Sequence, residues 1–155
     1  MADNYPHLVV AAILEKDGRF LIVEEETTKG VRWNNPAGHV EYTESILDAV
    51  IRETREETKW DFTPTHFLGV YQWVHPTAGV HYVRLCFTGT LDHCDESREL
   101  DKGILNTRWL TLEEIKAQPE MWRSPLVGRC IEDYLTQPHY PLSALSYLHK
   151  SQFTG

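Results

Sequence analysis

Residues 38–60 decide how the chain is organised and read Gly38-His-Val-Glu-Tyr-Thr-Glu-Ser-Ile-Leu-Asp-Ala-Val-Ile-Arg-Glu-Thr-Arg-Glu-Glu-Thr-Lys-Trp60. Residues 37–39 are expected to form a loop that contains the glycine. The amphipathic stretch after it predicts a helix over about residues 44–58, with Thr43 as the N-cap. The stripe expected to face a core consists of Leu47, Val50, Ile51 and Thr54.

Three glutamates, Glu53, Glu56 and Glu57, gather near the C-terminal end of this predicted helix. A helix turns by about 100° per residue, so the three carboxylates project from one arc along the edge of the buried stripe. Like charges at this spacing repel, and the helix dipole disfavours anions at this end. The acids either form a solvated face neutralised by Arg52 and Arg55, or bind a divalent cation, because Mg²⁺ prefers carboxylate oxygens.

The spacing of the fixed residues favours the cation. The positions Gly38, Glu44, Arg52, Glu53, Glu56, Glu57 and Trp60 fit the pattern G-x5-E-x7-R-E-U-x-E-E-x-G-U, in which U is a bulky apolar residue. The segment thus resembles the Nudix box of the Nudix hydrolase family. Two positions depart from the pattern: Thr54 takes an apolar slot, and Lys59 replaces the closing glycine that normally ends the helix in a left-handed conformation.

The resemblance implies an α/β fold, a Nudix-type α/β/α sandwich with a mixed β-sheet. The order of predicted elements, with strands on both sides of one central helix and helices after them, agrees. The resemblance also implies hydrolysis of a diphosphate with one to three divalent metal ions, Mg²⁺ or Mn²⁺ as its substitute. The metal ligands would then be Glu53, Glu56, Glu57, the backbone carbonyl of Ala37, and Gly38.

The box residues are also expected to have catalytic roles. One carboxylate near the metal would act as the general base, and Glu56 is the first choice, although the sequence alone does not decide it. Arg52 lies one turn before Glu56, and Glu44 lies two turns before Arg52. The pair is interpreted as orienting the metal ligands. The alternative is an ordinary surface salt bridge worth under about 1 kcal/mol.

Substrate contacts are predicted from two neighbouring strands. Tyr71 and Trp73 share one face of the first strand, and Arg84 shares a face with Tyr82 on the second. Aromatic rings beside an arginine could hold a base and a phosphate. Core packing would explain the aromatic residues equally well, whereas an arginine in mid-strand outside a core favours a binding role.

Two further residues are candidates for substrate contact. Arg123 precedes a predicted helix start, where backbone amides can bind anions, and simple capping is the alternative. His39 follows the glycine of the box and could meet the substrate, although a lone histidine is more often structural.

Short apolar runs and turn signals define the remaining elements. Strands are expected at residues 8–14, 20–23, 31–34, 65–74, 80–90 and 107–110. Residues 24–30 are expected to form a polar connection. A helix is predicted to open at Thr111, and another over 125–135 with Ser124 as its N-cap. The tail, residues 138–155, is expected to be irregular.

Segments outside the box point to one subgroup of the family. These segments are Trp33–Glu41, Tyr71–Pro76, Arg123–Val127 and Tyr140–Leu142. They resemble the NudJ subgroup of bacterial phosphatases over roughly residues 7–145. The resemblance implies release of phosphate from nucleoside tri- and diphosphates, and activity on thiamine-related pyrophosphates such as hydroxymethylpyrimidine pyrophosphate. The alternatives are a sanitising or dinucleotide-cleaving pyrophosphohydrolase, a non-catalytic nucleotide sensor, and an RNA decapping protein.

Composition limits the partners. The length of 155 residues predicts one domain over residues 1–155. The formal net charge of −8 argues against nucleic acid or an anionic membrane as the main partner. A small phosphorylated substrate remains compatible. The cysteines, Cys86, Cys94 and Cys130, form no metal-binding or disulfide pattern, and no leader or membrane segment is evident. These features predict a cytoplasmic protein, either a monomer or a homodimer.

Overall fold

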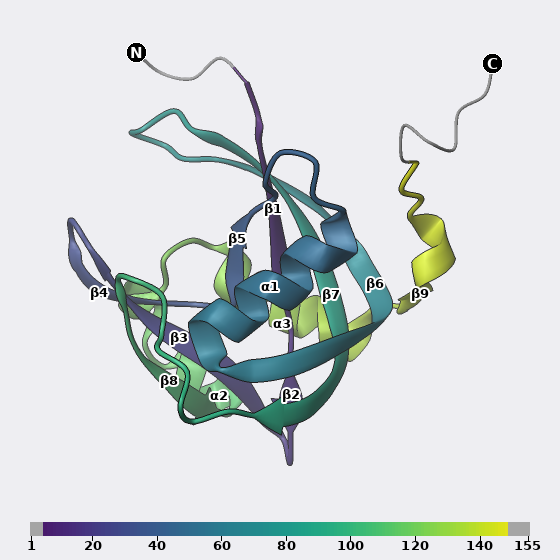
Figure 1. The fold of residues 1–155 in the computed structure, drawn as a ribbon. Helices are drawn as coiled ribbons and strands as arrows, with labels where there is room; N and C mark the ends of the chain where they lie inside the picture. The colour runs from purple at the N-terminus through teal and green to yellow at the C-terminus, as the bar shows by residue number, and fades with distance from the viewer. Residues whose placement is uncertain (1–4, 149–155) are drawn as a thin grey trace.

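Two β-sheets, with helix α1 on one side and helices α2 and α3 on the other, form the fold in the computed structural model, which describes residues 5–148 (Figure 1). The larger sheet has the order β5-β1-β7-β6-β9. Its strands are β5 (Ala37–His39), β1 (His7–Ala12), β7 (His81–Cys94), β6 (Trp60–Val74) and β9 (Tyr140–Pro141). The β1–β7 pair is parallel and the other pairs are antiparallel, so the sheet is mixed, as expected.

The second sheet is antiparallel. Its strands are β2 (Glu15–Lys16), β3 (Arg19–Thr27), β4 (Gly30–Asn34) and β8 (Ile104–Leu110), and β3 pairs with each of the other three. The helices are α1 (Ile46–Thr58), α2 (Leu112–Lys116) and α3 (Leu126–Thr136), with short 3-10 turns η1 (Pro119–Met121) and η2 (Leu142–Ala144). No helix within residues 5–148 is both long and apolar enough to cross a lipid bilayer.

The central strand β1 and the residues after it bury both of their faces, which explains the unbroken apolar run in the sequence. Side chains alternate between the faces of a strand. Val10, Ala12 and Leu14 belong to the core under α1. Ala11 and Ile13 belong to the second core, which α2 and α3 cover. The apolar residues of one element therefore join two separate cores.

Helix α1 begins two residues later than predicted. Ser45 is its N-cap and accepts a hydrogen bond from the Asp48 backbone N–H at 3.1 Å, so the expectation of Thr43 as the cap is wrong. Thr43 instead has a left-handed backbone, with φ of 65°. Of the predicted stripe, Val50 and Thr54 are buried, and Leu47 and Ile51 are partly buried against the core. Ala49, which was not part of the prediction, is buried as well.

The helix ends in the left-handed geometry that a glycine usually provides. Lys59 has φ of 68°, and its N–H donates to the Arg55 carbonyl oxygen at 2.9 Å. A β-carbon is strained in this region of φ and ψ. The exit geometry is thus kept despite the substitution, and the strain falls on one lysine.

Several boundaries differ from the sequence predictions. Strand β3 continues to Thr27 through the expected polar connection, and residues 37–39 form strand β5 rather than a loop. Ser124 is not the N-cap of α3; Pro125 is, while the Ser124 hydroxyl accepts from the Leu126 N–H at 3.2 Å. The tail contributes β9 and η2, so it is not wholly irregular, and its residues 149–155 lie outside the described range.

Candidate active site

Strand β5 and helix α1 touch at the glycine of the box. A β-carbon added to Gly38 would overlap the carboxylate of Glu53. The absence of a side chain therefore lets this carboxylate lie directly on the backbone of the strand. The glycine serves close packing here, because its φ is not in the left-handed region.

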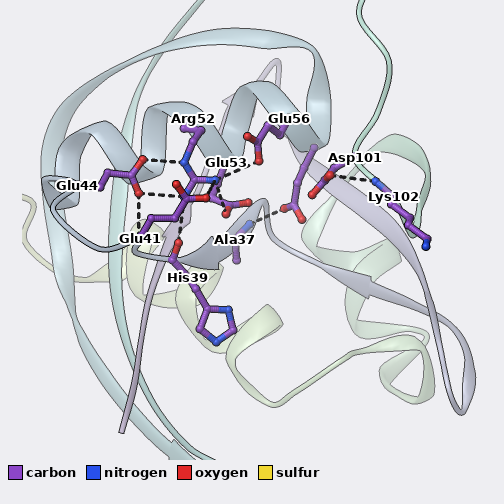
Figure 2. A network of polar contacts seen from close by, with 10 residues as sticks. Ala37, His39, Glu41, Glu44, Arg52, Glu53, Glu56, Asp101 and Lys102 are labelled. Carbon is purple, nitrogen blue, oxygen red and sulfur yellow. Dashed lines mark hydrogen bonds and ion pairs between the residues drawn. The ribbon is translucent and has the colours of Figure 1, made fainter.

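Arg52 forms hydrogen bonds to acidic residues of α1 and of the turn before it (Figure 2). Arg52 Nε and Nη2 donate to the two carboxylate oxygens of Glu44 at 2.7 and 3.0 Å. Its Nη1 donates to Glu53 Oε1 at 2.9 Å and to Glu56 Oε2 at 3.1 Å. Nη2 also donates to the His39 carbonyl oxygen at 3.0 Å. The guanidinium thus fixes three carboxylates and the strand beside them.

The charges of this network reinforce one another. Hydrogen bonds from Arg52 hold the pKa of Glu44 below its usual value, and the bond to Glu44 raises the pKa of Arg52. Both groups therefore remain charged over the whole neutral range. A bidentate guanidinium–carboxylate pair of this kind has a fixed orientation as well as a favourable energy.

The last glutamate of the helix has a different environment. Glu57 is 6% exposed, and its carboxylate accepts the Ala37 N–H at 2.8 Å. Burial raises the pKa of Glu57 to about 9, and nearby Glu25, Glu53 and Asp101 add to the effect. Burial likewise raises the pKa of Glu53 to about 7, against the opposing bond from Arg52. These carboxylates lack a positive charge sufficient to keep them ionised.

A divalent cation fits this donor set chemically. The oxygen donors are hard, and a cation would favour the charged forms that burial disfavours. Within the described residues, however, no three acidic, histidine or cysteine side chains are grouped closely enough to hold a metal ion as they stand. Arg52 instead binds one oxygen from each of Glu53 and Glu56. The second carboxylate oxygen of each, which accepts no hydrogen bond from Arg52, is left for a metal ion.

A pocket of about 580 Å³ opens beside the acidic residues. It borders strand β5 through Ala37, Gly38 and His39. Its lining also includes polar and aromatic residues, namely Glu25, Lys29, Arg32, Asn34, Trp73, His75, Tyr82, Arg84, Trp122 and Arg123. A pocket of this volume is of the size that holds small ligands.

Comparisons with known proteins agree with this geometry. A NUDIX domain model matches residues 5–127. The chain belongs to the Nudix hydrolase family. It is similar to phosphatase NudJ from Escherichia coli K12, with 36% identity over 140 residues that cover 90% of each chain.

Two solved structures show the same fold. A NUDIX hydrolase from Nitrosomonas europaea has a TM-score of 0.90 and 41% identity, covering 93% of this chain and 98% of the other. A MutT NUDIX hydrolase from Burkholderia pseudomallei has a TM-score of 0.71 and 21% identity, covering 84% of this chain and 98% of the other. The chain is therefore a Nudix enzyme that hydrolyses acid anhydrides in phosphorus-containing compounds, with the α/β fold of a family that typically depends on divalent metal ions.

The predicted substrate residues of this Nudix enzyme divide into two groups. His39, Trp73, Arg84 and Arg123 all line the pocket. Tyr71 is not among its lining residues; the Tyr71 hydroxyl donates to Asp133 Oδ2 at 2.9 Å, and the ring packs against the core under α3.

Arg84 is buried, which corrects its interpretation as an arginine outside the core. It is 4% exposed and donates to Asn35 Oδ1 at 2.8 Å and Asn34 Oδ1 at 3.1 Å. Strand β7 carries Arg84 on the face opposite Leu85, as the alternation predicted. Asn34 is the last residue of β4 and Asn35 follows it. Both lie in the segment Trp33–Glu41 that resembles the NudJ subgroup, but nothing in the sequence marked them as partners of Arg84.

Arg123 and His39 stand at the margins of the pocket. Arg123 forms an ion pair with Glu25 of β3, and its backbone N–H donates to the Trp33 carbonyl oxygen at 2.8 Å. The His39 ring contacts His7, and burial together with His7 lowers the pKa of His39. The His39 side chain extends away from the Arg52 network in Figure 2.

Other polar and aromatic residues of the site were not predicted. Glu25 and Asp101 add negative charge near Glu57, and the Asp101 N–H donates to the Glu56 carbonyl oxygen at 2.9 Å. Trp122 lines the pocket and packs so tightly on α3 that a β-carbon on Gly128 would overlap its ring. Glu25 lay in an expected polar connection and Asp101 in a stretch without a predicted element, so neither had a periodic pattern to mark it.

Proposed function

We propose that this Nudix hydrolase releases phosphate from nucleoside tri- and diphosphates and from related small pyrophosphates, such as hydroxymethylpyrimidine pyrophosphate or thiamine pyrophosphate. The observation that carries the proposal is the position of Glu57. Its buried carboxylate, held by the Ala37 N–H, lies against the strand that borders the pocket. The similarity to a protein named phosphatase NudJ supports phosphate release.

The proposed metal ligands are Glu53, Glu56, Glu57, the Ala37 carbonyl oxygen, and Gly38. When bound, Mg²⁺, or Mn²⁺ in its place, would neutralise charge on the phosphate oxygens and lower the pKa of a bound water. The raised pKa values of Glu53 and Glu57 support this assignment, because a cation would remove the cost of ionising them in a buried place.

The remaining acid and base roles follow from exposure and pairing. The Glu56 side chain is 40% exposed, against 12% for that of Glu53, so Glu56 has the better access to a water molecule and is the proposed general base. Arg52 and Glu44 are proposed to orient the ligands, since their bidentate pair fixes the guanidinium that holds Glu53 and Glu56.

The substrate is proposed to occupy the pocket, in contact with His39, Trp73, Arg84 and Arg123. Tyr71 lies outside this set. The net charge of −8 is compatible with an anionic substrate only because Lys29, Arg32, Arg84 and Arg123 gather on the pocket lining. Nucleic acid and membrane are excluded as proposed partners, since both need a broad basic surface.

The test is a panel of nucleoside di- and triphosphates, dinucleotides and thiamine-related pyrophosphates with Mg²⁺, scored for phosphate and pyrophosphate. Phosphate as the product, dependent on Mg²⁺, supports the proposal. Pyrophosphate as the product would favour the sanitising or dinucleotide-cleaving alternative. Nucleotide and Mg²⁺ binding by calorimetry without turnover would indicate a sensor.

We also propose that residues 1–155 act as one domain in a reducing cytoplasm. Cys86 and Cys130 are buried free thiols, and Cys94 is partly exposed and free as well. Size-exclusion chromatography with light scattering would distinguish the monomer from the homodimer.

A further inference from the structure

The inner end of the pocket holds a positive charge that no acidic group balances. Arg84 is almost fully buried, and its partners are the neutral side chains of Asn34 and Asn35 and, at 3.8 Å, the sulfur of Cys130. Across residues 5–148, no acidic side chain forms an ion pair with it. A buried charge without a counter-charge is costly unless its hydrogen bonds are satisfied.

The hydrogen-bonding capacity of Arg84 is only partly used. A guanidinium has five N–H donors. The contacts to Asn35, Cys130 and Asn34 use three of them. The buried Nε has no partner within the described part of the chain. Of the unused donors, the buried Nε is closed to a ligand, so the second N–H of Nη2 is the one that a ligand could reach from the pocket.

The position of Arg84 is set by two asparagines with different access to a ligand. Asn34 lines the pocket, whereas Asn35 does not and is only 1% exposed. The Asn35 amide instead donates to the Val127 carbonyl oxygen at 3.4 Å, which ties it to α3. Asn35 does not line the pocket itself and holds Arg84, which does, so it is a probe of the Arg84 position.

Aromatic rings line the pocket near Arg84. Trp73 and Tyr82 stack at 5.9 Å with an angle of 15° between their planes, and the His75 ring meets Trp73 edge-on. Trp122 also lines the pocket. Aromatic faces carry negative charge density, so they suit a flat, uncharged ring better than a phosphate. The acidic residues lie at the other border, along β5.

We propose that Arg84, held in place by Asn34 and Asn35, selects substrates that carry a planar heteroaromatic ring with a hydrogen-bond acceptor in its plane. The ring lies against the aromatic wall, and its carbonyl oxygen or ring nitrogen accepts an N–H of Arg84, while the diphosphate lies beside the acids of α1. Asn35 is a positioning residue for this contact. The assignment rests on the proposed hydrolase function and adds to it the group that the pocket recognises.

The experiment compares two substrates that differ only in the ring. One is the nucleoside diphosphate with the highest kcat/KM in the panel, and the other is ribose 5-diphosphate, which has the same sugar and diphosphate. The wild-type enzyme should have a markedly lower KM for the nucleoside diphosphate. Equal kcat/KM for the two substrates would overturn the ring assignment but leave the hydrolase function intact. Turnover of neither substrate would instead count against the hydrolase function itself.

The decisive variant is Asn35→Asp, which gives Arg84 a buried counter-charge without changing the shape of the side chain. It should raise KM for the nucleoside diphosphate about tenfold, the equivalent of one hydrogen bond to a charged group, with kcat nearly unchanged. KM for ribose 5-diphosphate should stay the same. The thermal midpoint serves here only to show that the variant folds, because the new ion pair with Arg84 and the lost donation to the Val127 carbonyl oxygen oppose each other.

The other outcomes contradict the proposal. An unchanged KM for both substrates would make Arg84 a purely structural link between β7 and β4. An equal rise of KM for both would mean that Arg84 contacts phosphate. If Asn35→Asp does not fold, Arg84→Lys tests the same difference between the two substrates, since lysine keeps the positive charge and loses the planar set of N–H donors. Asn106→Asp, an exposed change on β8, is the matched control and should alter neither KM.

Discussion

The two ends of the candidate active site are built in different ways. At the acidic end, Glu44, Arg52, Glu53, Glu56 and Glu57 come from one helix and the turn before it, and a single guanidinium joins most of them. At the other end, the aromatic and basic residues come from strands and loops that are far apart in the sequence. A constellation on one helix leaves a periodic pattern in the sequence, whereas one assembled from many segments does not.

The electrostatic balance of the two ends also differs. The acidic end holds carboxylates, those of Glu53 and Glu57, whose pKa values burial raises. The other end holds a buried guanidinium without an acidic partner in the described chain. The acidic end thus lacks the positive charge that a metal ion would bring, and the other end lacks the hydrogen-bond acceptor that a substrate ring would bring.

The largest effect is expected at the acidic end. Glu57→Gln should lower Mg²⁺-dependent kcat by about 1,000-fold, since a bound metal supplies several kcal/mol of transition-state stabilisation. The fold should persist, because the amide still accepts the Ala37 N–H. Steady-state kinetics and circular dichroism provide the measurements. Turnover close to that of the wild type would remove Glu57 from the metal site.

The stability of the metal-free enzyme should fall as pH rises. Glu57 has a pKa of about 9 in the folded chain, above its unfolded value of 4.5, so folding favours the protonated form. Its stabilising contribution is complete below pH 4.5 and is lost as pH rises towards 9, by at most about 1.4 kcal/mol per pH unit. Urea unfolding from pH 5 to pH 9 with a chelator would measure this slope.

Two comparisons isolate the cause of that slope. Added Mg²⁺ should flatten it by favouring the ionised carboxylates. Without metal, Glu57→Gln should flatten it above about pH 7 and reduce it below, where the raised pKa of Glu53 still contributes. Identical slopes for the wild type and the variant under chelator would show that another group is responsible.

A smaller effect is expected at the rim of the pocket. Arg123→Ala should raise KM about tenfold, the equivalent of one hydrogen bond from a charged group, and leave kcat nearly unchanged. The loss also frees Glu25, whose ion pair with Arg123 neutralises an acid beside the substrate. Arg19→Ala, which removes an exposed ion pair with Glu114 outside the pocket, is the control. No change in KM would limit Arg123 to a structural role.

The smallest expected effect concerns the end of helix α1 at Lys59, just after the acidic residues. Lys59→Gly should stabilise the protein by a few tenths to about 1 kcal/mol, because glycine adopts the left-handed conformation without strain but loses more backbone entropy. Lys59→Ala keeps the β-carbon and removes only a weak contact with Glu96, so it should give no gain. Chemical denaturation compares the three proteins. A loss of stability in Lys59→Gly would show that the left-handed strain is negligible.

The core could be predicted well from local patterns. The apolar run near the N-terminus and the stripe on α1 both fall on elements that pack in the core, because burial has the period of the secondary structure. The alternation in β7 did not reveal that residues 84–88 are buried on both faces of the strand. Boundaries were less predictable. Thr43 and Ser45 are both reasonable caps by residue type; Ser45 caps the helix, and Thr43 has a left-handed backbone in the turn before it.

The sequence by itself determined the Nudix fold, the acidic helix and the presence of an arginine beside the carboxylates, because each depends on residues that are close along the chain. Only the tertiary structure decided that Arg84 is buried between two asparagines, that Tyr71 turns to Asp133, and that Glu25 approaches Arg123. These contacts join segments separated by dozens of residues, so they depend on how the two sheets and α3 pack and not on any local periodicity.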